Sequence, residues 1–163
     1  MERENTMKLH HRFGIILGLF MTLLLGMPGQ AAADVTFTYE DEEEDSEGST
    51  YILITTEQSW TSAAQDCWSR NGALATVNNS EENTFLAGKL SEYGINHAWI
   101  GLHDQWTEGY FQWVSGDASD YRNWGAGEPN DTYPGEDFVE LRPSGTWNDL
   151  PTSWSIPAIC ELW

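Results

Sequence analysis

The sequence predicts one domain of the α+β class. Helical patterns come first along the chain and most strand patterns come second, whereas alternating helices and strands would predict a parallel βαβ sheet. About 130 residues follow a start that resembles an export signal, which is enough chain for one hydrophobic core. The strand patterns that follow the helices lie at 98–102, 110–114, 137–141 and 156–162.

The first elements of the domain are a strand and a helix. The run YILIT (51–55) is apolar and β-branched, which favours a strand. In 59–72, apolar residues recur at helical spacing, and Gly72 is expected to end the helix. We expect both tryptophans of this helix, Trp60 and Trp68, in the core.

A second helix is predicted in the run NSEENTFLAGKL. Asn79 and Glu82 have the spacing of a capping box, in which side chains satisfy the first backbone N–H groups of a helix. Phe85, Leu86 and Leu90 would form its buried stripe.

The amino-terminal part predicts export. Basic residues precede an apolar run at 13–27, and three alanines follow it, so we expect residues 1–33 to be a cleaved signal peptide. An uncleaved amino-terminal anchor is the alternative. The stretch 34–49 contains the acidic run EDEEEDSEG and is expected to be a disordered leader, with the folded domain over 50–163.

Charge and cysteines limit the partners and the compartment. The net charge is −19, and signal cleavage makes it −20, which disfavours nucleic acid and anionic membranes as partners. No second apolar run is present for membrane insertion after cleavage, so we expect a secreted, extracellular product. Cys67 and Cys160 can pair in an oxidising compartment, and two free thiols are the alternative.

A long acidic loop carries the functional prediction. More than 20 residues without a strong pattern separate two of the predicted strands, which is costly unless something orders them. Carboxylate and amide side chains gather there and in its surroundings, and hard Ca²⁺ prefers such oxygen ligands. A solvated acidic surface is the alternative. The candidates are Asp104, Glu108, Glu128, Asn130, Asp131, Glu136, Asp137, Asn148 and Asp149.

Four motifs identify a resemblance. SW..A...C, WIGL, EPN and WND follow one another in an order and spacing that resemble the C-type lectin domain family, from Tyr51 to Leu162. The resemblance implies a double-looped α+β fold with two helices and small antiparallel sheets, in which strands near the two ends of the domain are neighbours. It also implies a disulfide between Cys67 and Cys160.

The same resemblance implies the metal ligands. A sugar-binding calcium would be held by Glu128, Asn130, Glu136, Asn148 and Asp149. An auxiliary calcium would be held by Asp104, Glu108, Asp131 and Asp137. The family's usual second disulfide is missing, because Phe138 and Thr152 stand where cysteines are common.

The EPN motif implies the sugar class. In the family it accompanies mannose-type ligands, namely mannose, N-acetylglucosamine, glucose or fucose, and a cis peptide bond before Pro129. The carboxylates and amides would accept and donate hydrogen bonds to two neighbouring hydroxyls on the ion. Tyr133 could contact the sugar or pack within the loop, and both readings stay open.

The predicted function is therefore a secreted calcium-dependent carbohydrate-binding protein without enzymatic activity, whose partners are glycans or glycoconjugates. The alternative is the same fold binding protein or another surface such as ice, with calcium only structural. A glycosidase with paired carboxylates is disfavoured, because each acid already has a ligand role. His97 and His103 lack a recognisable nucleophile partner and are expected to be structural or exposed.

Overall fold

The computed structural model of the chain describes residues 33–40, 48–133 and 135–163. The predicted signal peptide, apart from Ala33, and the acidic run at 41–47 lie outside these residues. No helix within the described ranges is long and apolar enough to cross a membrane.

The structure confirms the α+β class, with two helices and eight strands among the described residues. The elements that match the predicted patterns are β2 (Ser49–Gln58), α1 (Trp60–Ser69), α2 (Ser80–Glu92), β4 (Ala98–His103), β5 (Gln112–Trp113), β6 (Phe138–Leu141) and β8 (Ile156–Leu162). Three short strands were not predicted: β1 (Val35–Tyr39), β3 (Gly72–Leu74) and β7 (Trp147–Leu150).

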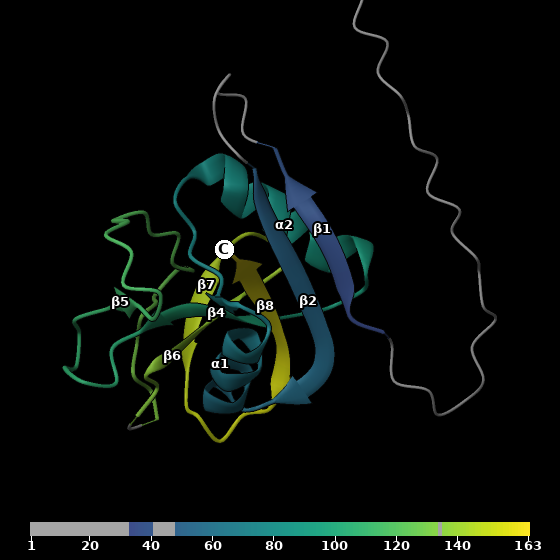
Figure 1. Ribbon diagram of the computed structural model, residues 1–163. Helices are drawn as coiled ribbons and strands as arrows, with labels where there is room; N and C mark the ends of the chain where they lie inside the picture. The colour runs from purple at the N-terminus through teal and green to yellow at the C-terminus, as the bar shows by residue number, and fades with distance from the viewer. Residues whose placement is uncertain (1–32, 41–47, 134) are drawn as a thin grey trace, which may run out of the picture. The chain divides into compact units, whose positions relative to one another are not determined.

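All strands join one sheet, in the order β1-β2-β8-β4-β6-β7, with β3 beside β8 and β5 beside β4 (Figure 1). The expected small antiparallel sheets are thus connected, because β4 and β8 pair in parallel at Trp99 and Ala158. The expected pairing near the ends of the domain is confirmed, since β2 runs antiparallel to β8 from Thr50↔Leu162 to Ile54↔Ala158.

The two helices pack on opposite faces of this sheet. Successive residues of a strand point to opposite faces, and β4 shows the consequence. Ile100 packs in the cluster that contains Leu86 and Leu90 of α2. Trp99 packs in the cluster that contains Trp60 of α1.

The expectation of a disordered leader is wrong for Val35–Tyr39. This strand pairs with β2, and its alternate residues turn toward the core. The ring of Phe37 lies 5.9 Å from that of Tyr51 and 5.7 Å from that of Phe85. The alternating burial of VTFTY fits a strand with one face on the core.

The cap of α2 matches its prediction and the end of α1 does not. Asn79 accepts a hydrogen bond from the N–H of Glu82 at 2.8 Å, and Glu82 accepts one from the N–H of Asn78 at 2.8 Å. After α1, the left-handed position is taken by Asn71, with φ of 60°, instead of Gly72. Gly72 starts β3, where a Cβ would lie 2.3 Å from a backbone oxygen of β8.

Trp60 is buried as predicted, but Trp68 is 71% exposed. The two residues are eight positions apart, which turns the second about 80° away from the first on the helix. Trp68 instead contacts the ring of the last residue, Trp163, edge-on at 5.8 Å.

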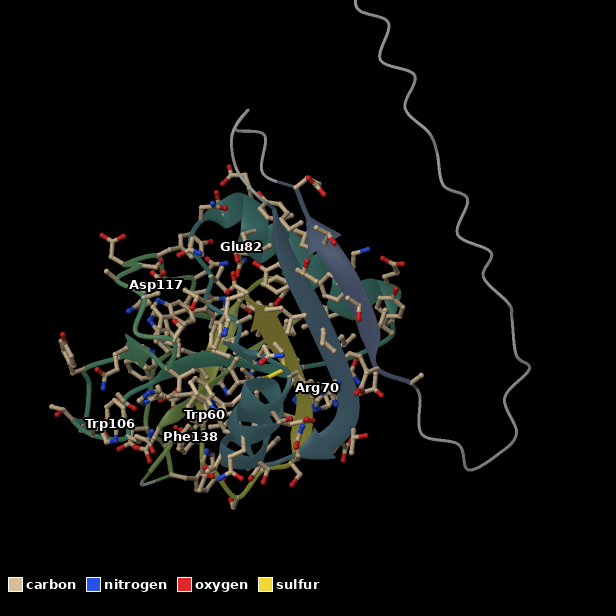
Figure 2. All side chains as sticks on the ribbon, viewed as in Figure 1. Trp60, Arg70, Glu82, Trp106, Asp117 and Phe138 are labelled. Carbon is tan, nitrogen blue, oxygen red and sulfur yellow. A yellow bond between two sulfur atoms is a disulfide. The ribbon has the colours of Figure 1, made fainter. Side chains whose placement is uncertain are left out.

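A disulfide between Cys67 and Cys160 joins α1 to β8, as the resemblance implied. The position of the family's second disulfide is filled by apolar packing. Phe138 is 4% exposed, and its ring lies 4.7 Å from that of Trp60. Figure 2 shows these two side chains next to each other. Thr152, on the other side of the missing bond, is exposed.

Candidate functional site

The long connection between β4 and β6 has two parts, and the first is ordered by aromatic side chains. We call 111–124 the aromatic segment. Trp113, Tyr121 and Trp124 meet the buried ring of Trp147 edge-on, at centroid distances of 5.8, 5.7 and 6.0 Å. Arg122 donates hydrogen bonds to three backbone carbonyls of this segment. This part of the loop therefore needs no cation for its order.

The second part, 128–137, is the acidic segment, and it closes on Asp149 of β7. The carboxylate of Asp149 is 2% exposed. It accepts hydrogen bonds from the backbone N–H of Asn130 at 3.1 Å and of Asp131 at 3.0 Å. The amide of Asn130 also donates to Glu128. The peptide bond between Glu128 and Pro129 is cis, as the resemblance implied.

Thr132 connects the rest of the predicted sugar-calcium ligands. Its N–H is shared by Asn130 Oδ1 and Glu136 Oε2, both at 2.8 Å. Glu136 is 7% exposed. The structure thus brings Glu128, Asn130, Glu136 and Asp149 into one hydrogen-bonded group.

Asn148 belongs to the neighbouring network of Glu140. Its Nδ2 donates to Glu140 Oε1 at 3.3 Å, which leaves Oδ1 and the second amide hydrogen for a ligand. Glu140 is 2% exposed and also binds Arg142 Nε at 2.8 Å and His97 Nδ1 at 2.9 Å. Sequence reasoning missed Glu140, although its place two residues after Phe138 on a predicted strand could have shown that a carboxylate points inward.

The predicted auxiliary ligands are linked only in part, through a hydrogen bond from the backbone N–H of Asp104 to the carbonyl of Asp137 at 3.1 Å. Asp104 Oδ2 accepts a hydrogen bond from Gly109 N at 2.8 Å, while its buried Oδ1 has no partner among the described residues. Burial raises the pKa of Asp104 from 3.8 to about 6, and the charges of Glu108 and Asp137 add to this rise. Burial and the charge of Asp131 raise the pKa of Asp137.

The electrostatics of both groups favour a cation. Burial raises the pKa values of Glu128 and Glu136, and the charge of Asp149 raises both further. No Lys or Arg of the described chain forms an ion pair with any of the predicted ligands. Buried carboxylates without a positive partner are costly. The donor set and the unpartnered oxygen of Asp104 therefore fit a hard divalent ion.

The predicted ligands are connected by hydrogen bonds, but they do not surround a metal position. In the parts of the chain that the structure describes, no group of three or more His, Cys, Asp or Glu side chains is arranged to hold a metal ion. Two amides belong to the predicted sugar-calcium set, and the hydroxyl of Thr132 now occupies Asn130 Oδ1. Binding would require these internal hydrogen bonds to be exchanged for metal bonds.

The remaining aromatic and histidine residues lie around this site. Tyr133 is 66% exposed and Trp106 is 70% exposed. The edge of Trp106 meets His103 at 4.8 Å, so Trp106 packs on the loop while staying accessible (Figure 2). His103 is fully buried, as a structural residue should be, and both its ring nitrogens lack a partner among the described residues.

Comparison with known proteins assigns the family. The family model described as the lectin C-type domain matches residues 56–162. This chain belongs to the C-type lectin domain family. Collectin-10 of Gallus gallus is 36% identical over 113 residues, which cover 69% of this chain and 41% of that protein. The chain thus spans less than half the length of this relative.

Two solved structures of proteins with different functions have folds similar to that of this chain. One is the cow carbohydrate-recognition domain of CD23, determined in the presence of a GlcNAc2Man3 oligosaccharide. It is 33% identical with a TM-score of 0.63, covering 69% of this chain and 86% of that one. The other, a herring type II antifreeze protein, is 25% identical with a TM-score of 0.64, covering 72% and 93%.

Proposed function

We propose that this domain is a carbohydrate-binding module without enzymatic activity, which recognises mannose-type sugars through a bound calcium ion. The ion would be held by Glu128, Asn130, Glu136, Asn148 and Asp149. An auxiliary calcium would be held by Asp104, Glu108, Asp131 and Asp137. Calcium would offer its open coordination positions to two neighbouring hydroxyls, while the ligands exchange hydrogen bonds with the same hydroxyls.

The burial of unpaired carboxylates is the observation that carries this proposal. Asp149 and Glu136 are almost completely buried, and no Lys or Arg of the described residues forms an ion pair with either of them or with Glu128. A protein that used this loop only as a solvated surface would leave such groups exposed. The oligosaccharide in the structure of the related CD23 domain supports a glycan as the partner.

A second candidate keeps the fold and gives calcium only a structural role, with protein or another surface as the partner. The likeness to an antifreeze protein and the absence of a closed acidic cage in the described residues favour it. We favour the sugar-binding function because each proposed ligand position carries a residue that can bind the metal. The proposed site of action is extracellular, after removal of the signal peptide.

Retention on mannose-agarose separates these candidates. We expect retention in Ca²⁺ and release both by EDTA and by free mannose. Release by EDTA alone would leave calcium dependence without sugar recognition and would favour the second candidate. No retention in Ca²⁺ would overturn the proposed function.

A double substitution then tests the two residues of the EPN motif. Glu128→Gln with Asn130→Asp keeps side-chain size and total charge but exchanges the donor and acceptor ends around the diol. A hydroxyl that faces the wrong partner costs about 1 to 3 kcal/mol, so mannose affinity should fall while calcium stays bound. Glu57→Gln, on an exposed part of β2, is the control. Unchanged mannose affinity in the double variant would show that these two residues do not determine sugar specificity.

A further inference from the structure

Cations are scarce in the folded domain, and three of them are held by carboxylates or backbone carbonyls. Arg70 pairs with Asp34 and Asp66. Lys89 pairs with Glu92. Arg122 donates hydrogen bonds to three backbone carbonyls. These account for three of the four Lys and Arg residues within the described ranges.

Arg142 is the fourth. Its Nε donates to Glu140 Oε1 at 2.8 Å, and its two terminal Nη groups have no hydrogen bond to any described residue. The side chain is 43% exposed. The guanidinium is therefore fixed at one nitrogen, with two donors turned to solvent.

The position of Arg142 places these donors beside the proposed sugar site. Arg142 Nε and Asn148 Nδ2 bind the same oxygen of Glu140, so they lie only two hydrogen bonds apart. Glu140 and Asn148 are direct cross-strand partners in β6 and β7.

The free Nη groups of Arg142 can donate hydrogen bonds to an anion. Its parallel N–H donors match two oxygens of a carboxylate or a sulfate, and such charge-assisted pairs are stronger than bonds to neutral hydroxyls. Glu140 holds the side chain in advance, so little rotamer freedom is left to lose. His97 binds the other oxygen of Glu140 at 2.9 Å, so Arg142 shares that carboxylate with both Asn148 and His97.

We propose that Arg142 forms an anion subsite next to the sugar-binding calcium, so that the domain prefers hexoses carrying a sulfate or carboxylate substituent over their neutral counterparts. This inference rests on the proposed function, because the calcium-bound diol brings the substituent to Arg142. It adds a substrate class, acidic glycans, that the strongly negative net charge of the chain would by itself disfavour.

Paired sugars test the subsite. Calorimetric titrations in Ca²⁺ at about 0.15 M salt, where long-range repulsion is screened, would compare N-acetylglucosamine with its 6-sulfate and glucose with glucuronic acid. The variants are Arg142→Gln, whose amide can still donate to Glu140, and Arg70→Gln as a matched control. The original chain should bind at least one anionic sugar about tenfold more tightly than its neutral partner. The pair of sugars that shows the preference identifies sulfate or carboxylate as the group recognised.

The outcomes separate the two proposals. Arg142→Gln should abolish the preference and leave neutral-sugar affinity unchanged, and Arg70→Gln should keep the preference. Neutral and anionic sugars bound equally by the original chain would overturn the subsite alone. An equal loss for both sugars in Arg142→Gln would also overturn it, because Arg142 would then act only through Glu140 and Asn148. No binding of any sugar in Ca²⁺ would overturn the proposed function and the subsite together.

Discussion

The two parts of the long loop are held in different ways. In the aromatic segment, three rings meet Trp147 and the polar groups bond to one another or to the backbone. In the acidic segment, carboxylates crowd around Asp149 with only N–H and hydroxyl donors between them. The first part is complete as an assembly of protein groups, whereas the second has an excess of negative charge.

This difference shows which part of the loop is built for stability and which for binding. Aromatic contacts order a segment at all calcium concentrations, because they are internal to the chain. Buried carboxylates make a segment responsive to a cation, because a bound cation relieves their mutual repulsion. The predictions below test whether the two segments respond differently to calcium.

The largest effect is expected at the centre of the aromatic segment. Trp147→Ala should lower the free energy of unfolding by about 3 to 5 kcal/mol, because it leaves a large cavity under three rings. The loss should be present in full in EDTA. Urea unfolding followed by tryptophan fluorescence measures it, and Trp147→Phe provides a milder variant if the alanine form does not fold. A loss that appears only in Ca²⁺ would contradict the distinction between the segments.

A smaller loss is expected from the residue that anchors Trp147. Asn83 accepts a hydrogen bond from Trp147 Nε1 at 2.7 Å and donates one to Gly145 O at 2.9 Å. Asn83→Ala should cost about 1 to 3 kcal/mol, because it leaves a buried indole N–H without a partner. In a Trp147→Phe background no indole N–H is left without a partner, so Asn83→Ala should cost less there. Equal losses in the two backgrounds would show that the hydrogen bond to Trp147 contributes little.

The smallest effect concerns pH in the absence of calcium. The pKa of Asp104 is raised in the folded state, so its protonation favours folding. Its contribution is fully present below the ordinary value near 3.8 and is lost as pH rises through about 6. In EDTA, unfolding curves between pH 4 and 7 should therefore show a loss on the order of 1 to 2 kcal/mol from this group. Asp104→Asn should flatten that part of the profile, and an unchanged slope would remove Asp104 as its cause.

Sequence patterns predicted both helices from apolar periodicity and strands β2, β4, β5, β6 and β8 from short apolar runs. Strands β3 and β7 were missed, and tertiary pairing with β8 and β6 creates them. The exposed position of Trp68 depends on where the helix rests on the sheet, which local sequence does not contain.

The sequence predicted which residue types form the candidate site, but it did not predict the contacts between them. Carboxylate and amide residues in the acidic segment pointed to calcium, and the structure brings them together around Asp149. The long loop was expected to need something that orders it, and three rings on Trp147 order its first part. Glu140 and the free donors of Arg142 were not found, because their role follows from the pairing of β6 with β7.

Thermal unfolding in Ca²⁺ and in EDTA tests most directly whether the acidic segment is completed by a cation. Binding to the folded state adds about 2.7 kcal/mol at a hundredfold excess over the dissociation constant. For a domain of this size, that corresponds to a rise in Tm on the order of 10 °C. We expect this rise in millimolar Ca²⁺ for the original chain, and its loss in Asp149→Asn. The same Tm for the original chain in Ca²⁺ and in EDTA would contradict the account.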